Sequence, residues 1–203
     1  VPYGNLIYKE DWENPGQLSL DSQIQYAVQK KYNIGLSQFD YIGEYFGDEF
    51  ARIEPPEEYL ADDVGYIFPQ EEIEGIVEQA LGTPPEQLRE NAGYLYLPER
   101  EGYWFFGGGL GEVWIPRITG VQEENGIVRL TYDVCVQAST AVDGEGKTVQ
   151  FPERYVKTMQ MALTYNPDGS VRYLSAVEAE PTAQTAARMM LEQGVPYYEV
   201  YCE

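Results

Sequence analysis

Apolar residues recur at two different spacings along this chain, and the spacing changes near residue 94. Before that point the spacing is helical. A helix is predicted to follow Ser19, its N-cap, and to run to about Tyr32, with an apolar face made of Ile24, Ala27 and Val28. A second helix is predicted from Pro69 to Gly82, with acidic residues in its first turn and an apolar stripe made of Ile73, Ile76, Val77 and Ala80.

Two shorter helices are predicted from capping signals. One follows directly, with Thr83 as its cap, Pro84 at its first position and Leu88 facing inward. The other is expected after Pro181, with Thr182 as its cap and an inward face made of Ala186, Met189 and Met190.

From Tyr94 onward, apolar and polar residues alternate, which is typical of strands with one buried face. Hairpin turns are predicted at Asn125-Gly126 and over 166–169. Along one strand, the alternation puts Val134 on the buried face and leaves Asp133 half-exposed. The predicted strands cover residues 94–97, 103–106, 113–121, 127–138, 154–165 and 171–178.

These elements predict an α+β fold in which N-terminal helices pack on a curved antiparallel sheet. All the strands between residues 94 and 178 are expected to join that one sheet. We interpret residues 1–203 as a single domain. Within it, 1–67 is irregular and partly helical, and 68–203 holds a helix and the antiparallel sheet core.

The charge balance excludes several partners. The chain has 34 acidic and 13 basic residues, for a net charge of −21. Such a chain repels phosphate backbones, so nucleic acid is excluded as a partner. Because no apolar run is long enough to span a bilayer, this chain is expected not to insert into membranes. Acidic clusters such as Glu71, Glu72 and Glu74 are interpreted as solvated faces.

The chain has no histidine, which removes the commonest general base and the usual nucleophile–histidine pairs. Two cysteines without histidine make a zinc site improbable, and the ligand pattern of an EF-hand is absent. No metal or cofactor is therefore expected, no catalytic residue is assigned, and catalysis is disfavoured.

The candidate binding site is a set of aromatic residues around a glycine-rich loop. The loop opens no helix, so a hairpin loop is favoured over a phosphate cradle. The aromatic side chains are suited to stacking on a sugar or a peptide, although alternation places about half of them in the core. The candidate residues are Tyr103, Trp104, Phe106, Gly107, Gly108, Gly109 and Trp114.

The two cysteines, Cys135 and Cys202, bear on location. Cys135 is predicted to lie on the half-exposed face of its strand, and such a cysteine in an exported protein is usually paired, so a bridge between the two is favoured. The chain begins with Val1-Pro2, is rich in tyrosine and is poor in lysine. These features favour an extracellular or cell-envelope location, with a lipid anchor on a removed N-terminal segment as one form of it.

The stretch from Phe68 to Gly82, with Leu88-Arg89, Tyr94, the Gly107 loop, Ile118, Val121 and the segment 126–133, resembles uncharacterised lipoprotein and secreted domains of Gram-positive bacteria. Some of those domains are similar to cystatin-like or NTF2-like folds, in which a helix lies in the concavity of a bent sheet. The resemblance covers residues 68–180 or so and implies a fold and a location. It implies no catalytic residue.

Our first functional hypothesis is therefore a non-catalytic extracytoplasmic domain that binds a protein, a peptide or a glycan. One alternative is a carboxylate-dependent hydrolase of cell-wall or dietary glycans. The other alternative is an inhibitor of an envelope enzyme, whose acidic surface would engage a basic groove.

Overall fold

The computed structural model describes residues 10–32, 55–61, 65–106, 114–136, 139–142, 146–151 and 153–192. The fold is α+β, and its strands form antiparallel sheets. The α-helices are α1 (Leu20–Tyr32), α3 (Gln70–Leu81), α4 (Pro85–Asn91) and α5 (Ala183–Glu192). Short 3-10 helices cover η1 (Pro15–Gln17), η3 (Glu57–Tyr59), η4 (Gly93–Leu95) and η5 (Pro98–Arg100).

The strands form three sheets. Sheet A has the order β4-β5-β8-β9, sheet B the order β1-β3-β2, and β6 and β7 pair as a separate hairpin. The strands of sheet A are β4 (Trp114–Glu124), β5 (Ile127–Val136), β8 (Arg154–Tyr165) and β9 (Val171–Ala179). The remaining strands are β1 (Gly65–Pro69), β2 (Tyr96–Leu97), β3 (Gly102–Phe106), β6 (Ser139–Val142) and β7 (Thr148–Phe151).

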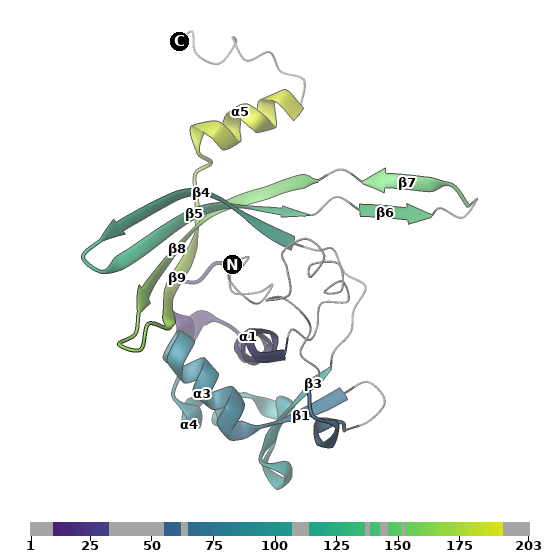
Figure 1. Ribbon diagram of the computed structural model, residues 1–203, viewed down its shortest axis with the longest axis vertical. Helices are drawn as coiled ribbons and strands as arrows, with labels where there is room; N and C mark the ends of the chain where they lie inside the picture. Colours follow the sequence, from purple (N-terminus) through teal and green to yellow (C-terminus); the bar gives the residue numbers. More distant parts are fainter. Residues whose placement is uncertain are drawn as a thin grey trace.

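Sheet A lies between two unequal helical layers (Figure 1). α1 and α3 lie below it with α4 and sheet B, and among the described helices only α5 lies on its opposite face. Buried apolar side chains from α1, α3, β3, β5 and β8 form one cluster between the lower helices and the sheet. We call the face of sheet A that meets this cluster the inner face, and the face under α5 the outer face.

Local signals in the sequence explain the main helix ends. The Ser19 hydroxyl accepts a hydrogen bond from the amide of Ser22, 3.1 Å away, which confirms the predicted cap of α1. Gly82 ends α3 in the left-handed conformation, with φ of 72°. The cap predicted for α4 is wrong by one position: Pro84 is the N-cap and Pro85 the first helical residue. The Thr83 hydroxyl instead donates to Gln23, 2.7 Å away.

The prediction of one sheet over residues 94–178 is wrong in its first part. β2 and β3 pair with β1 in sheet B, and only β4, β5, β8 and β9 form the meander of sheet A. The alternating pattern identified β2, β3, β4, β5, β8 and β9, but it carries no information about the partner of each strand. The Asn125-Gly126 turn is as predicted, with φ of 52° and 77°.

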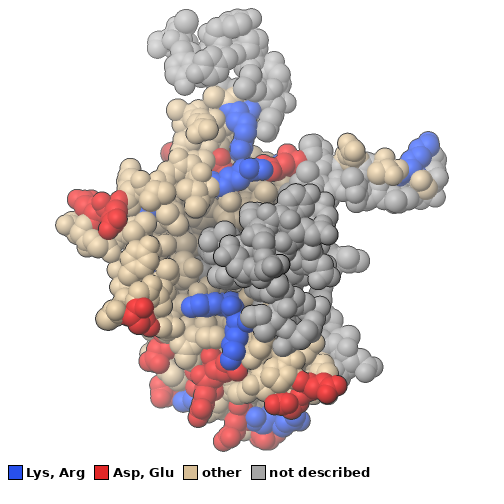
Figure 2. All heavy atoms as spheres, in the orientation of Figure 1, with Lys and Arg blue, Asp and Glu red and all other residues tan. Residues whose placement is uncertain are grey.

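Charged side chains are unevenly distributed over the face shown in Figure 2. Acidic and basic groups crowd the helical end around α3 and α4, and an acidic group marks the tip of the β4–β5 hairpin. That tip carries Glu123 and Glu124. Fewer charges lie between these two regions. Within the described residues, no helix has the length and apolar character needed to cross a membrane.

Candidate functional site

The structure separates the residues of the predicted aromatic site. Trp104 lies in sheet B, opposite Ile67, and Trp114 begins β4 of sheet A, opposite Val136. Both tryptophans are partly buried and pack against the core. The side chain of Phe106 and residues Gly107, Gly108 and Gly109 lie outside the described part of the chain.

Tyr103 is a core residue. Its side chain is fully buried, so in this conformation it offers no surface to a ligand. Its hydroxyl donates to Glu74, 3.0 Å away, and burial together with that carboxylate raises the pKa of Tyr103. The guanidinium of Arg89 contacts both oxygens of Glu74, at 3.0 and 2.8 Å. Glu74 was predicted to lie on a solvated face, which is wrong: it is a buried partner that fixes α3 against α4 and β3.

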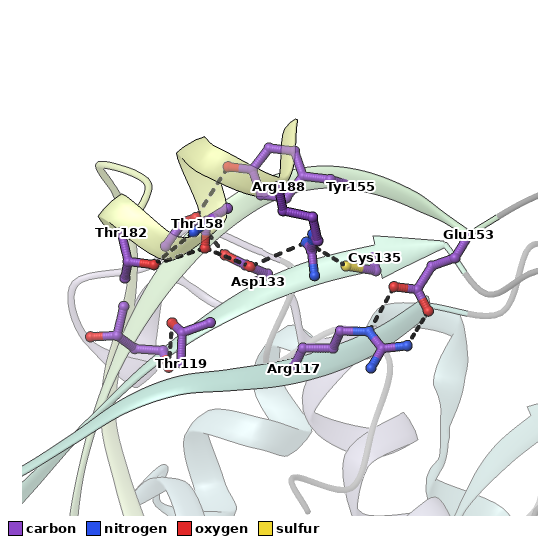
Figure 3. Close-up of polar contacts among 11 residues, drawn as sticks. Arg117, Thr119, Asp133, Cys135, Glu153, Tyr155, Thr158, Thr182 and Arg188 are labelled. Atoms are coloured by element: carbon purple, nitrogen blue, oxygen red, sulfur yellow. Dashed lines mark hydrogen bonds and ion pairs between the residues drawn. The ribbon is translucent and has the colours of Figure 1, made fainter. Parts of the chain in front are cut away.

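A second buried carboxylate, Asp133 of β5, lies on the outer face of sheet A (Figure 3). One oxygen accepts a hydrogen bond from the Thr158 hydroxyl of β8, 2.7 Å away. The other accepts from Thr185 at 2.7 Å and from Arg188 at 3.3 Å, both on α5. Asp133 is only 1% exposed, so the prediction of a half-exposed position is wrong.

α5 docks through this carboxylate because of how the helix begins. Thr182 caps α5, its hydroxyl accepting from the amide of Thr185, 3.2 Å away. Thr185 and Arg188 are three residues apart and so lie on one face of the helix. That face of α5 contacts Asp133, so the contact between α5 and sheet A is polar at this point. The inward face predicted from the sequence was made of Ala186, Met189 and Met190, and it included neither Thr185 nor Arg188.

Cys135 lies two residues after Asp133 on the same face of β5, beside Arg188, whose guanidinium is 3.8 Å from the sulfur. It is fully buried, not half-exposed as predicted, and it forms no disulfide with another described residue. Burial, followed by the nearby charge of Glu153, raises the pKa of the thiol. Cys202 lies outside the described residues, so the bridge between the two cysteines stays a prediction.

Arg117 of β4 forms an ion pair with Glu153 near Cys135. The guanidinium of Arg117 donates to both carboxylate oxygens of Glu153, one of them 2.6 Å away. These hydrogen bonds lower the pKa of Glu153 and raise the pKa of Arg117. Figure 3 shows the pair beside Cys135 and apart from the contacts of Asp133.

The polar groups around Asp133 are suited to holding α5 on sheet A. A general base needs an accessible lone pair, and both oxygens of Asp133 already accept hydrogen bonds from protein groups in a buried position. The raised pKa of Cys135 keeps its thiol protonated and poorly nucleophilic. No group of acidic or cysteine side chains in the described part of the chain is arranged to hold a metal ion. We therefore assign Asp133 and the side chains that contact it, Thr158, Thr185 and Arg188, to the docking of α5.

The two edges of sheet A differ. The outer edge of β9 is paired at Ala176 with Trp12, through hydrogen bonds of 2.7 and 2.9 Å. β4 forms the other edge, and β5 is its only pairing partner among the described strands. On β4, Ile118 is 57% exposed and Val121 is 63% exposed. Both lie on the inner face, opposite Tyr132 and Leu130 of β5. Apolar side chains at an accessible strand edge are suited to contact with another chain.

Sequence reasoning missed this surface, although a signal was present. Ile118 and Val121 are three positions apart, which breaks the alternation of a regular strand. The break is a bulge between Ile118 and Gly120, where the register with β5 shifts. No family model, curated protein or solved structure matches this chain at the level at which relatives are recognised. The site is therefore interpreted from its own geometry.

Proposed function

We propose that this protein is a non-catalytic, extracytoplasmic protein-interaction domain that binds its partner along strand β4. The observation that supports it is the exposure of Ile118 and Val121 on an edge strand of sheet A. An edge strand presents backbone N–H and C=O groups, and an extended partner can add to them as a further strand. The exposed apolar side chains would then be covered by side chains of that partner.

The arrangement of the buried carboxylates supports binding over turnover. Glu74 is held by Arg89 and Tyr103, and Asp133 by two threonines and Arg188. Both are almost fully buried. A carboxylate pair that hydrolyses a glycan must instead face a substrate and a water molecule.

The finer fold assignment and the location belong to this proposal. α1 and α3 lie together against one face of sheet A, as a helix does in the concavity of a cystatin-like or NTF2-like sheet (Figure 1). The tyrosine-rich, lysine-poor composition and the resemblance to secreted and lipoprotein domains favour a position outside the cytoplasm or in the cell envelope.

The proposal is tested by selecting short peptides from a random displayed library on the purified chain, held dilute. Selected peptides are expected to share a period-two apolar pattern and to shift the backbone amide resonances of residues 117–122. Val121→Lys places a charge in the contact and should weaken binding at least about tenfold. Tyr94→Lys is the matched control, because Tyr94 is 80% exposed on another part of the chain.

Two results would overturn the proposal. One is a set of peptides that bind equally well to Val121→Lys and to the unmodified chain. The other is turnover of a glycan or a peptide that a single carboxylate substitution abolishes.

A further inference from the structure

We infer that the partner of β4 is a second copy of this chain, paired antiparallel about a two-fold axis that passes between Thr119 and Gly120. This inference rests on the proposed function and names the partner of the same surface. A two-fold axis perpendicular to the sheet makes an edge strand meet itself in the antiparallel sense, so the surface must be complementary to itself.

The inner face is self-complementary in its apolar residues. Ile118 lies opposite Tyr132 and Val121 opposite Leu130, so both point to the inner face in spite of the bulge between them. The proposed axis sets Ile118 of one copy opposite Val121 of the other. Because the axis acts twice, each exposed side chain gains an apolar neighbour, and both apolar pairs form on the same side of the joined sheets.

The outer face is self-complementary in charge. Arg117 lies opposite Asp133 and Glu124 opposite Ile127, and the alternation of the strand puts both on the outer face. In the proposed register, Arg117 faces Gln122 of the second copy and has Glu124 of that copy as its diagonal neighbour. Diagonal neighbours of this kind lie within reach of long side chains. The register therefore brings Glu124 of one copy close to Arg117 of the other at both ends, beside the Glu153 that Arg117 already contacts.

Features of β4 that limit pairing fall at the ends of the proposed contact. Pro116 has no N–H to donate, and the axis sets it opposite Glu123 of the second copy, where pairing is expected to stop. The other edge of sheet A is paired with Trp12. Because the described part of the chain occupies the β9 edge at Ala176 and leaves β4 without an outer partner, pairing through β4 gives a closed dimer and no extended fibre.

The association is expected to be weak, because six paired residues from each copy form a small interface at the low end of specific contacts. A dissociation constant of about 10 to 100 µM is expected. Sedimentation equilibrium of the full chain over that concentration range should show a reversible change from the monomer mass to twice that mass. Ile118→Lys and Val121→Lys should each weaken the dimer at least about tenfold, and Tyr94→Lys should leave it unchanged.

The register is tested by disulfide cross-linking in a Cys202→Ser background, in which the remaining native cysteine, Cys135, is fully buried. An equal mixture of Ile118→Cys and Val121→Cys chains should cross-link to a mixed dimer on mild oxidation, because the two positions face each other. Either variant alone should cross-link at least about tenfold more slowly, since its own two cysteines lie about three residues apart along the joined edge.

The outcomes separate this inference from the proposed function. A chain that stays monomeric at every concentration and still binds selected peptides through Val121 overturns the second copy and keeps the interaction surface. A dimer that is indifferent to both lysine substitutions overturns the inference as well. A monomer that binds no peptide through β4 overturns both.

Discussion

The two faces of β5 carry opposite chemistry at nearly the same depth. On the inner face, Val134 and Tyr132 pack in the apolar core. On the outer face, Asp133 and Cys135 are buried just as completely, below α5. The alternation of the strand separates the two sets, but it does not separate buried residues from exposed ones. The polarity of a strand face therefore predicts the kind of partner it has, apolar side chains or hydrogen-bonding groups, and not its contact with water.

Substitutions on the two faces of β5 should also destabilise the fold for different reasons. An apolar position tolerates no charge, because the charge would be buried without a partner. A buried carboxylate with satisfied oxygens tolerates no deletion, because its donors are left unpaired. Substitutions at Val134, Asp133, Thr185 and Glu153 test this difference.

The largest effect is expected from substitutions at the two neighbouring positions of β5. Val134→Asp should lower the free energy of unfolding by about 4 kcal/mol or more, because it buries an unpaired charge. Asp133→Ala should lower it by about 2 to 3 kcal/mol, because Thr158 and Thr185 lose their acceptor. Urea unfolding measures both values. If Asp133→Ala left the free energy of unfolding unchanged, the hydrogen bonds of Asp133 would contribute nothing to stability. The proposed difference between the two faces of β5 would then be wrong.

An intermediate effect is expected from Thr185→Val, which keeps the shape of the side chain and removes its hydroxyl. The hydrogen bond to Asp133 is lost, and the free energy of unfolding should fall by about 1 to 2 kcal/mol. α5 should also detach more often, so Cys135 should react with iodoacetamide at least about tenfold faster in a Cys202→Ser background. Gln184→Ala, at an exposed position of α5, is the control and should leave the rate unchanged. An unchanged rate in Thr185→Val would show that α5 does not protect the thiol.

The smallest effect is expected from Glu153→Gln at the border of the outer face. The pair with Arg117 is partly exposed, so at neutral pH the loss should be about 0.5 kcal/mol or less. Arg117 lowers the pKa of Glu153 in the folded state below its ordinary value of 4.5. The contribution of the pair is therefore present above that value and is lost as the pH falls through the lowered pKa. Unfolding of both chains between neutral and acid pH measures the difference, and a difference that grows on acidification would contradict this sign.

Much of the fold could be predicted from local signals. The Ser19 cap, the Gly82 stop and the Asn125-Gly126 turn act over a few residues, so the sequence contains the whole of each cause. α1, α3, β8 and β9 match their predicted ranges closely for this reason. The predicted strand 127–138 also matches β5, although residues 137 and 138 lie outside the described part of the chain.

The rest depended on contacts between distant segments. β1, β6 and β7 were not predicted, and sheet B was not separated from sheet A. The burial of Asp133 depends on α5, which joins it through Thr185, and the hydrogen bond spans 52 positions. No spacing within β5 contains that information. The aromatic residues around the glycine loop were predicted as one site because they are close in sequence, yet Trp104 and Trp114 belong to different sheets.

The bridge between Trp12 and Ala176 has a consequence for the order of events during synthesis. The amide of Glu178 also donates to Asp11, which precedes it by 167 positions. A ribosome makes Asp11 and Trp12 before β9, so the earlier segment cannot pair until β9 has been made. The Trp12 side chain, which ends almost fully buried, has no β9 to pack against during that time. Among the described segments, the pairing of Trp12 with β9 is therefore a late step, and until it forms neither edge of sheet A has an outer partner.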